Sequence, residues 1–449
     1  MPNACQRDAV LPACGDGGSS GARWRTFIPL LAAAISLTGC ARFDPETTNE
    51  PDPTILTITS LGDGPIRAFE LRRFTDFAAS RKNVKIRYIP AFESFNLRLE
   101  LYQRLLKDRS PQPDILEIDV IWPGLLGDDL LDLTPYFRNQ MASFPPDLLQ
   151  TYTVHGRLIA IPLYVDSGVL YYRSDLLRKY GFSGPPETWD DLERMSKVIQ
   201  SGERRLGHAN FWGYVWQGNA GEALTCNGLE WQASQGGGHI IEPDGTITVG
   251  NAAAVRAVER AVSWIGVISP PGTTAYIEDD ALNTYAAGNA AFMRNWSSMH
   301  ESVRSRSHFG ETAAALLPAG KSGHGRTLGG IAISVSKYSE HRDEAVAALR
   351  DLVSADSQSK RALALGITPT LLALAQSPEL MRKTPFHGEL SGQALSGLQP
   401  RPSVVAGRVY DQVSRAYYQA VHSALTRAVP PPIAMARLQT ELERIVKTK

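Results

Sequence analysis

The sequence predicts an α/β protein of two lobes with a ligand cleft between them. A chain of 449 residues is too long for one ordinary hydrophobic core and indicates more than one compact unit. β-Rich runs alternate with helical periods between residues 54 and 119, which is typical of a parallel sheet covered by helices. Strand-like runs return after a long helical region, so the chain crosses between lobes more than once. Two lobes joined in this way form a hinged cleft.

The first 40 residues have the pattern of an export signal. Arg23 and Arg25 precede an apolar run at 27–37, which is shorter than the roughly 20 residues needed to span a bilayer. The run ends in LTGC at 37–40, which resembles a bacterial lipobox and implies a lipid on Cys40. An uncleaved membrane anchor is the alternative. We expect a signal peptide at 1–39 and, at 40–53, the lipidated cysteine with a polar, proline-containing tether that cannot bury a core.

The first lobe begins at residue 54. β-Rich runs at 54–60, 84–89 and 113–119 are separated by helical periods, and the run at 84–89 alternates like a half-buried strand. Ligands of open α/β sheets bind at the carboxyl ends of the strands, which places Asp63 and the segment from Asp119 to Trp122 near a site. We assign 54–164 and about 281–337 to this lobe.

The stretch at 161–176 is central to the prediction. It places Tyr164 and Asp166 on one face of a strand, because side chains alternate along strands, and then runs apolar into Tyr171 and Tyr172. Helices are predicted to start at Thr188, a capping residue, and to cover 222–235, 251–268 and 341–354. We assign 165–280 and about 338–449 to the second lobe.

Composition excludes several classes of function. The 46 basic and 46 acidic residues cancel, so no nucleic acid partner is expected. The nine histidines are scattered without a metal-binding spacing, and Gly320-Lys321-Ser322 lacks the upstream glycine of a phosphate loop. We therefore expect neither a metal nor a cofactor. Once the leader is removed, Cys226 is predicted to be a small buried residue.

Eight segments in collinear order carry a family resemblance. They are DVIW (119–122), PLYVDSGVLYYR (162–173), PPETW (185–189), QSGE (200–203), FWGYVWQG (211–218), AAFMRNW (290–296), LGG (328–330) and PRP (400–402). With them the chain resembles the family 1 extracellular solute-binding proteins of bacterial ABC importers, and most closely the trehalose/maltose-binding branch. The resemblance implies the two-lobed periplasmic-binding-protein fold.

The resemblance also implies a function and a set of partners. It implies a monomer that captures a disaccharide or short α-glucoside by hinge closure and delivers it to a membrane permease powered by a separate ATPase. With the lipid on Cys40, the protein would be held on the extracytoplasmic face of the cell envelope. It would not be an enzyme.

The resemblance places the sugar contacts by position. They fall on Arg98, Asp119, Tyr164, Asp166, Trp296, Gly329, Gly330 and Arg401, and the weaker candidates are Asp63, Trp122, Gln217 and Glu222. The chain departs from close relatives in two places: Ile331 stands where they have an aromatic residue after the paired glycines, and Gly221 where they have a tyrosine.

These residue types suit an uncharged sugar. A carboxylate accepts hydrogen bonds from neighbouring hydroxyls, and a guanidinium donates in a fixed fork. An aromatic face takes the apolar side of a pyranose and excludes water.

Two other classes remain open from the residues alone. A glycoside hydrolase would use Asp119 and Asp166 as its acid and base. A surface scaffold lipoprotein would bind no ligand and would not need Asp, Arg and Trp side chains at strand ends.

Overall fold

The computed structural model describes residues 52–59, 64–92, 95–307, 309, 311–384, 393, 395 and 397–448. The predicted signal peptide, Cys40 with nearly all of the predicted tether, and the weaker site candidate Asp63 lie outside the described residues. Residues 51–449 form one compact unit by their contacts.

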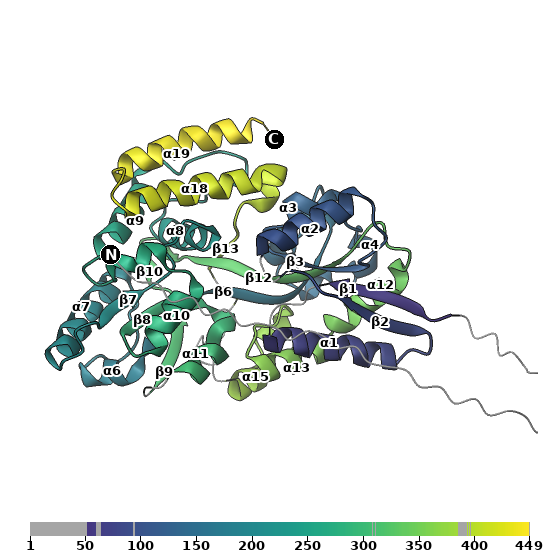
Figure 1. Cartoon of the computed structure of the whole chain (residues 1–449), viewed down its shortest axis with the longest axis horizontal. Helices are drawn as coiled ribbons and strands as arrows, with labels where there is room; N and C mark the ends of the chain where they lie inside the picture. Colours follow the sequence, from purple (N-terminus) through teal and green to yellow (C-terminus); the bar gives the residue numbers. More distant parts are fainter. Residues whose placement is uncertain are drawn as a thin grey trace, which may run out of the picture. The chain divides into compact units, whose positions relative to one another are not determined.

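The main sheet has strand order β2-β1-β3-β12-β6-β8-β7, with β9 paired to β6 and β13 paired to β12 (Figure 1). Its strands are β1 (Thr54–Thr59), β2 (Val84–Ile89), β3 (Ile115–Asp119), β6 (Ile161–Arg173), β7 (Trp212–Val215), β8 (Ala290–Trp296), β9 (Thr312–Leu316), β12 (Arg326–Val335) and β13 (Leu398–Gln399).

The first three strands confirm the predicted parallel α/β unit. β1 pairs in parallel with β2 and with β3, and the run predicted at 84–89 is β2. Because parallel strands point the same way, their carboxyl ends share one edge of the sheet. β12 then enters between β3 and β6 and is antiparallel to both. This register brings residues of the late chain beside Asp119.

β6 joins the two halves of the sheet. Its 13 residues are nearly all buried, as expected for a strand covered on both faces. The segment from Ile161 to Ser167 pairs with β12, whereas the segment from Gly168 onward pairs with β8 and β9. The strand therefore changes partners at Ser167 and Gly168, directly after Asp166.

Helices cover the sheet from several sides. The longer helices, and the short ones that adjoin the site, are α1 (Gly64–Ala79), α2 (Phe95–Lys107), α3 (Pro123–Leu126), α7 (Trp189–Arg205), α8 (Glu222–Ser234), α9 (Ala252–Trp264), α10 (Glu278–Ala286), α11 (His300–Arg306), α12 (Arg342–Leu352), α13 (Ala355–Leu365), α17 (Ser403–Ala406), α18 (Tyr410–Leu425) and α19 (Pro431–Val446). α1 packs against β2, α12 and α13. α18 packs against α8, α9 and α19, and the two yellow helices lie side by side in Figure 1.

Short elements connect these parts. They are α4 (Thr134–Phe137), α5 (Pro146–Thr151), α6 (Ser174–Lys179), α14 (Leu372–Ala375), α15 (Pro378–Lys383), β4 (Thr153–Val154), β5 (Arg157–Leu158), β10 (Ala319–Gly320), β11 (Gly323–His324) and the 3-10 turns η1 (Gly127–Asp129), η2 (Met141–Ser143), η3 (Pro271–Ala275), η4 (Ser297–Met299) and η5 (Gly407–Val409).

The predicted helix start at Thr188 is confirmed. The Thr188 side chain accepts a hydrogen bond from the backbone N–H of Asp191 and so satisfies one free donor of the first turn of α7. The helices predicted at 222–235, 251–268 and 341–354 correspond to α8, α9 and α12. Each is shorter than its prediction, and α9 ends at Trp264 because the backbone at Ile265 is extended.

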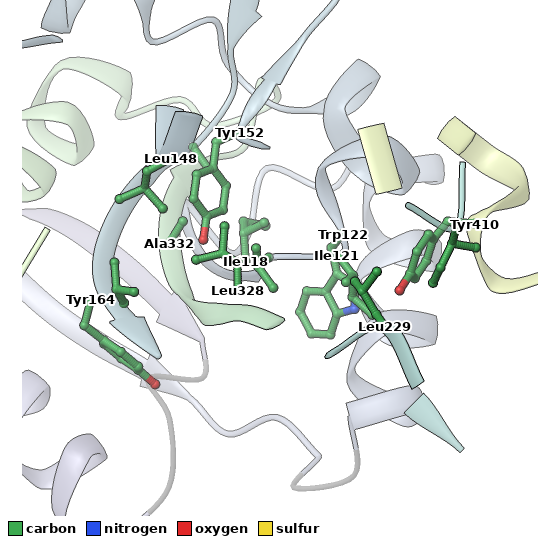
Figure 2. Close-up of a cluster of buried hydrophobic side chains, with 14 of the residues drawn as sticks. Ile118, Ile121, Trp122, Leu148, Tyr152, Tyr164, Leu229, Leu328, Ala332 and Tyr410 are labelled. Carbon is green, nitrogen blue, oxygen red and sulfur yellow. The ribbon is translucent and has the colours of Figure 1, made fainter. Parts of the chain in front are cut away.

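The hydrophobic core runs under the site. Figure 2 shows Tyr152, which follows α5, beside Ile118 of β3 and Ala332 of β12, all of them buried. A second set of aromatic rings lies beside α7, α8 and α9. The rings of Trp216, Trp231 and Trp264 meet edge to face at 5.0–6.3 Å between centroids, the favourable geometry for aromatic pairs. Both groups of side chains belong to one continuous hydrophobic core, which holds rigid the elements that carry the site.

Cys226 is a buried free cysteine, as predicted. Burial raises the pKa of its thiol to about 12, so the thiolate is disfavoured. Within the part of the chain that the structure describes, no helix combines the length and the apolar character needed to cross a bilayer.

Candidate functional site

A cavity of about 310 Å³ lies where strand ends and helix starts meet. The residues that line it are Asp119 of β3, Tyr164 and Asp166 of β6, Trp296 of β8, Gly329, Gly330 and Ile331 of β12, Glu222, Ala223 and Cys226 of α8, Glu278 of α10, and Arg401. Seven of the eight predicted contacts are in this set, together with the weaker candidate Glu222. The eighth, Arg98, lies elsewhere.

Three of these residues form a row across three neighbouring strands. Ile331 of β12 pairs with Asp119 of β3 on one side and with Tyr164 of β6 on the other. Side chains of directly opposite residues lie about 4.5–5.5 Å apart at Cβ and share one face. We call Asp119, Ile331 and Tyr164 the ridge.

The paired glycines let the strands and Trp296 approach closely. A Cβ on Gly329 would come within 2.8 Å of Cζ3 of Trp296. Gly330 has φ +119, and a Cβ there would lie 2.4 Å from the carbonyl oxygen of Tyr164. Both positions therefore require glycine, Gly330 because of its backbone conformation as well.

Trp296 is half-buried and held from two sides. The Arg294 guanidinium lies 4.4 Å from the ring centroid, and the indole N–H donates to Oε1 of Glu278 at 3.2 Å. Arg294 is itself fixed by a buried two-bond pair with Glu230, at 2.6 and 3.0 Å. The Trp296 ring thus lines the cavity in a fixed orientation, which suits stacking on a pyranose.

Asp166 binds the segment that follows Trp296. Its carboxylate accepts hydrogen bonds from the backbone N–H groups of Ser167 and Ser298 at 2.8 and 3.0 Å, and from the hydroxyls of Ser297 and Ser298. Three of these four bonds go to Oδ1, so Oδ2 keeps room for a further donor. Asp166 therefore ties β6 to η4 and still presents an acceptor to the cavity.

Arg401 and Glu222 form an ion pair in the lining of the first cavity. Nη1 of Arg401 bonds Oε1 of Glu222 at 2.8 Å, and Glu222 also accepts from the hydroxyls of Tyr410 and Ser414. Burial disfavours the charged guanidinium, but the negative groups around it hold the pKa of Arg401 well above its usual value. Nε of Arg401 is buried without a hydrogen-bond partner among the described residues. Because an unpaired buried donor is costly, a ligand oxygen that reached Nε would be favoured.

Asp119 is the carboxylate at the end of β3. Burial raises the pKa of Asp119 to about 6, although Arg401 and the backbone N–H of Ile121 oppose the shift. The N–H of Ile121 donates to Oδ1 at 3.0 Å. Glu222 adds a like charge that raises the pKa further.

A second cavity of about 530 Å³ adjoins the first. The three ridge residues line both cavities. The second cavity also receives Arg98 and the weaker candidate Trp122, with Glu117 of β3. Arg98 is buried and bonded to Glu117 at 2.6 Å, and its Nε donates to the carbonyl of Phe92.

The weaker candidate Gln217 lies behind the site. Its amide donates to the carbonyl of Arg294 at 3.0 Å and accepts from the Arg294 side chain, and it is fully buried. It is absent from the residues that line the two cavities, so its contacts position Arg294.

The sequence did not identify Glu278, Ala223 or Cys226 as lining residues. Glu278 starts α10, and an acidic residue in a first helical turn is common because it complements the helix dipole. Sequence alone gives no means of separating it from the acidic starts of other helices. Ala223 and Cys226 carry no recognisable chemistry and line the cavity only because α8 begins there.

Among the described residues, no cluster of His, Cys, Asp and Glu side chains is arranged to hold a metal ion.

Comparisons with known proteins agree with this arrangement. The chain matches the family of bacterial extracellular solute-binding proteins over residues 68–359. A probable ABC transporter-binding protein of Deinococcus radiodurans is 38% identical over 395 residues, which cover 87% of this chain and 94% of that protein.

Solved structures confirm the predicted fold. Maltose-bound MalE3 of T. maritima is 33% identical, with a TM-score of 0.77 and coverage of 87% of this chain and 99% of that one. The GacH receptor of Streptomyces glaucescens, at 20% identity, shares the fold with a TM-score of 0.76, covering 89% of this chain and 99% of that one. The architecture is thus the two-lobed periplasmic-binding-protein fold. Family and fold together show that this chain belongs to the bacterial extracellular solute-binding proteins of ABC transporters, a family of carriers and not of enzymes.

Proposed function

We propose that the protein captures a disaccharide or short α-glucoside of the trehalose/maltose type and delivers it to a membrane permease. The main support is the composition of the first cavity. Carboxylates, a guanidinium with a free N–H, and a fixed Trp296 ring converge there. Neutral hydroxyls need acceptors and donors in fixed places, and a pyranose needs an apolar face to stack on.

Each group has a role in this proposal. Asp119 and Oδ2 of Asp166 accept from sugar hydroxyls, Arg401 donates through Nε, and Trp296 stacks on a ring. Gly329 and Gly330 bring backbone within reach of the ligand. The maltose-bound state of the T. maritima relative supports this ligand class.

Capture proceeds by hinge closure in our proposal. The lobes are residues 54–164 with about 281–337, and 165–280 with about 338–449. Sugar bridges them, and its binding energy shifts the population toward the closed form. The permease then recognises the loaded form, and a separate ATPase supplies the energy.

Calorimetric titration with maltose and trehalose tests the function. Saturable binding of either sugar, with the sugar recovered unchanged, supports a carrier. Release of glucose would instead support the hydrolase, and absence of binding to both sugars would support the scaffold. A thermal-shift screen across disaccharides identifies the preferred one, because a ligand at one hundred times its Kd stabilises a protein by about 2.7 kcal/mol.

We also propose that a lipid on Cys40 anchors the monomeric protein to the cell envelope. The support is the LTGC sequence at 37–40, which follows a cationic start and an apolar run. Labelling cells with a radioactive fatty acid should mark the wild type and leave Cys40→Ser unlabelled. Equal labelling of both proteins would rule out Cys40 as the acylated residue.

A further inference from the structure

Four cationic side chains lie close together where β2 begins. Arg81 and Lys82 stand in the turn that precedes the strand, and Lys85 and Arg87 are on the strand itself. All four side chains are exposed. The chain carries no acidic residue from 77 to 92, so this positive charge is not offset locally in the sequence. We call Arg81, Lys82, Lys85 and Arg87 the basic corner.

The charges of the basic corner are not neutralised by acids from other elements. Among the described residues, none of the four side chains forms an ion pair. Arg81 lies over the ring of Phe77, and Arg87 donates to the side-chain oxygen of Gln112 at 2.7 Å. Asp52 is exposed just before β1 and offsets at most one of the four charges. The corner is therefore a net positive surface that is open to an anionic partner.

The chain enters the fold at the basic corner. The backbone N–H of Thr54 donates to the carbonyl oxygen of Asn83 at 2.7 Å, and Thr54 pairs with Val84 in the sheet. The next residue, Ile55, pairs with Lys85 and is 43% exposed. An exposed apolar side chain among cations is the combination that favours the boundary between lipid headgroups and acyl chains.

The tether makes a weak attraction to a membrane sufficient. A peptide of the length predicted for 41–53 spans at most about 45 Å. With a lipid on Cys40, binding of the corner to the bilayer is an intramolecular event, which raises the effective concentration of the two surfaces. Anionic lipid headgroups attract nearby cations and strengthen binding about fivefold for each Lys or Arg at the surface.

Protection of a sheet edge explains only part of the basic corner. β2 is the outermost strand of the main sheet (Figure 1), and lysine on an edge strand prevents pairing with another chain. This role accounts for Lys85. It does not account for Arg81 and Lys82, which stand in the turn before the strand and cover no strand edge.

We propose that the basic corner docks on the headgroups of anionic phospholipids, with Ile55 at the contact. The inference goes beyond sugar binding and rests on the proposed lipid on Cys40, which brings the protein to a bilayer. The corner lies at the amino ends of β1 and β2, whereas Asp119 lines the first cavity from the carboxyl end of β3, which runs parallel to them. Docking therefore turns the cavity away from the bilayer, toward the sugar in solution.

Flotation with lipid vesicles tests the inference on a chain that begins at residue 41. This chain contains the whole compact unit at 51–449 and carries no lipid. It should bind vesicles made of equal parts of phosphatidylglycerol and phosphatidylcholine, and should not bind vesicles of phosphatidylcholine alone. Raising the salt from about 0.1 M to about 1 M shortens the Debye length from about 10 Å to about 3 Å and should release it.

The double variant Lys82→Ala and Lys85→Ala removes two cations from the corner. Its partition coefficient for the anionic vesicles should fall at least about tenfold, because each cation contributes about fivefold. Lys197→Ala with Lys321→Ala is the matched control, since it removes the same charge from exposed positions on α7 and in the β10–β11 turn. It should bind like the wild type. None of the four lysines lines either cavity, so an unchanged maltose affinity shows that both variants are folded.

A fluorescent label reports which surface meets the bilayer. The chain from residue 41 contains one native cysteine, Cys226, which is buried. A polarity-sensitive dye on Asn83→Cys should shift its emission to shorter wavelength when the anionic vesicles are added. The same dye on Lys321→Cys should keep its emission unchanged.

The outcomes separate this inference from the proposed functions. Equal binding to both kinds of vesicle, equal losses in the two double variants, or equal dye shifts at the two positions would overturn it. Binding to dextran sulfate, a soluble anionic polymer, without binding to vesicles would assign the corner to a polymer and overturn it as well. Sugar titration and fatty-acid labelling of Cys40 test the carrier and the anchor independently, so either can stand when docking fails.

Discussion

The Asp166 side chain lines the cavity and also holds the segment that follows Trp296 through hydrogen bonds. Asp166→Ala should weaken sugar binding by about 1.5–3 kcal/mol or more, the usual value of a hydrogen bond to a charged group. The same change leaves the backbone N–H of Ser298 without its acceptor, so thermal stability should also fall. Calorimetry and thermal unfolding of the same samples measure the two effects.

Ser298→Ala is the matched control for the Asp166→Ala variant. It removes one donor to Oδ2 and keeps the carboxylate, so its effect on sugar affinity should be smaller than that of Asp166→Ala. Unchanged affinity in Asp166→Ala would exclude Asp166 as a contact.

The raised pKa of Asp119 predicts that the stability of the folded protein depends on pH. Burial raises its pKa from 3.8 to about 6 in the folded protein. A raised carboxyl pKa means that the folded state binds the proton more tightly than the unfolded state. Stability therefore falls as pH rises from about 4 through about 6, and stays lower above that.

The Asp119→Asn variant has no carboxyl group to ionise at this position, so it should not lose stability as the pH rises. We expect its thermal unfolding midpoint to exceed that of the wild type at pH 8, and the difference to shrink toward pH 4. Sugar affinity should fall, because an amide accepts weaker hydrogen bonds than a carboxylate. A constant difference between the two proteins across this pH range would contradict the assignment of the shift to Asp119.

At the scale of elements, β6 connects the two halves of the sheet. The buried ion pair between Arg294 and Glu230 lies beside the crossing point, the position at Ser167 and Gly168 where β6 changes strand partners. A Cβ on Gly168 would lie 2.1 Å from Oε1 of Glu230 and 2.9 Å from Nη2 of Arg294. Glu230 also accepts from the backbone N–H of Thr327 on β12. The pair thus joins α8, β8 and β12 around the point where β6 changes partners.

Arg294→Met should destabilise the fold by about 3–5 kcal/mol, because it leaves the buried carboxylate of Glu230 unpaired. Urea denaturation followed by circular dichroism measures this loss. The matched control is Arg444→Met, which removes an exposed pair with Glu441 on α19 and should leave the midpoint unchanged. Equal midpoints for the two variants would show that the buried pair does not support the crossing point.

Some elements of the fold could be predicted from the sequence, and others could not. The parallel β1–β2–β3 unit, the single long strand at 161–173 and the cap at Thr188 follow local rules of periodicity and capping, and all are confirmed. The ridge does not follow from local rules. It depends on β12 entering antiparallel between β3 and β6, and a pairing between residues so far apart in sequence leaves no periodic signal.

The predicted site residues also fall into two groups: those whose place follows from a local motif, and those whose place depends on tertiary packing. Those within motifs at strand ends, such as Asp119 and Tyr164, lie together in the first cavity. Arg98, predicted from position alone, is bonded to the buried Glu117 and lines the second cavity instead. Glu117 falls in the same β-rich run as Asp119, but only the packing of α2 reveals that it faces Arg98.

At the scale of the whole molecule, hinge closure predicts that sugar makes the protein more compact. α3 follows Asp119, and α17 follows Arg401, so each helix begins shortly after a residue that lines the first cavity. They contact each other, and a Cβ on Gly124 of α3 would come within 2.0 Å of the carbonyl oxygen of Ser403. In the proposed division this contact joins the two lobes.

Gly124→Ala should separate α3 from α17 and so disfavour the closed form. The backbone at Gly124 is helical, so alanine fits locally and only the contact is lost. Apparent affinity falls with the fraction of molecules able to close, by tenfold for each 1.4 kcal/mol. Small-angle scattering should show a smaller decrease in radius of gyration on adding maltose than in the wild type. Gly184→Ala, at a position with open space around it, is the matched control and should behave as the wild type. If Gly124→Ala kept wild-type affinity and wild-type compaction, the contact between α3 and α17 would have no part in closure.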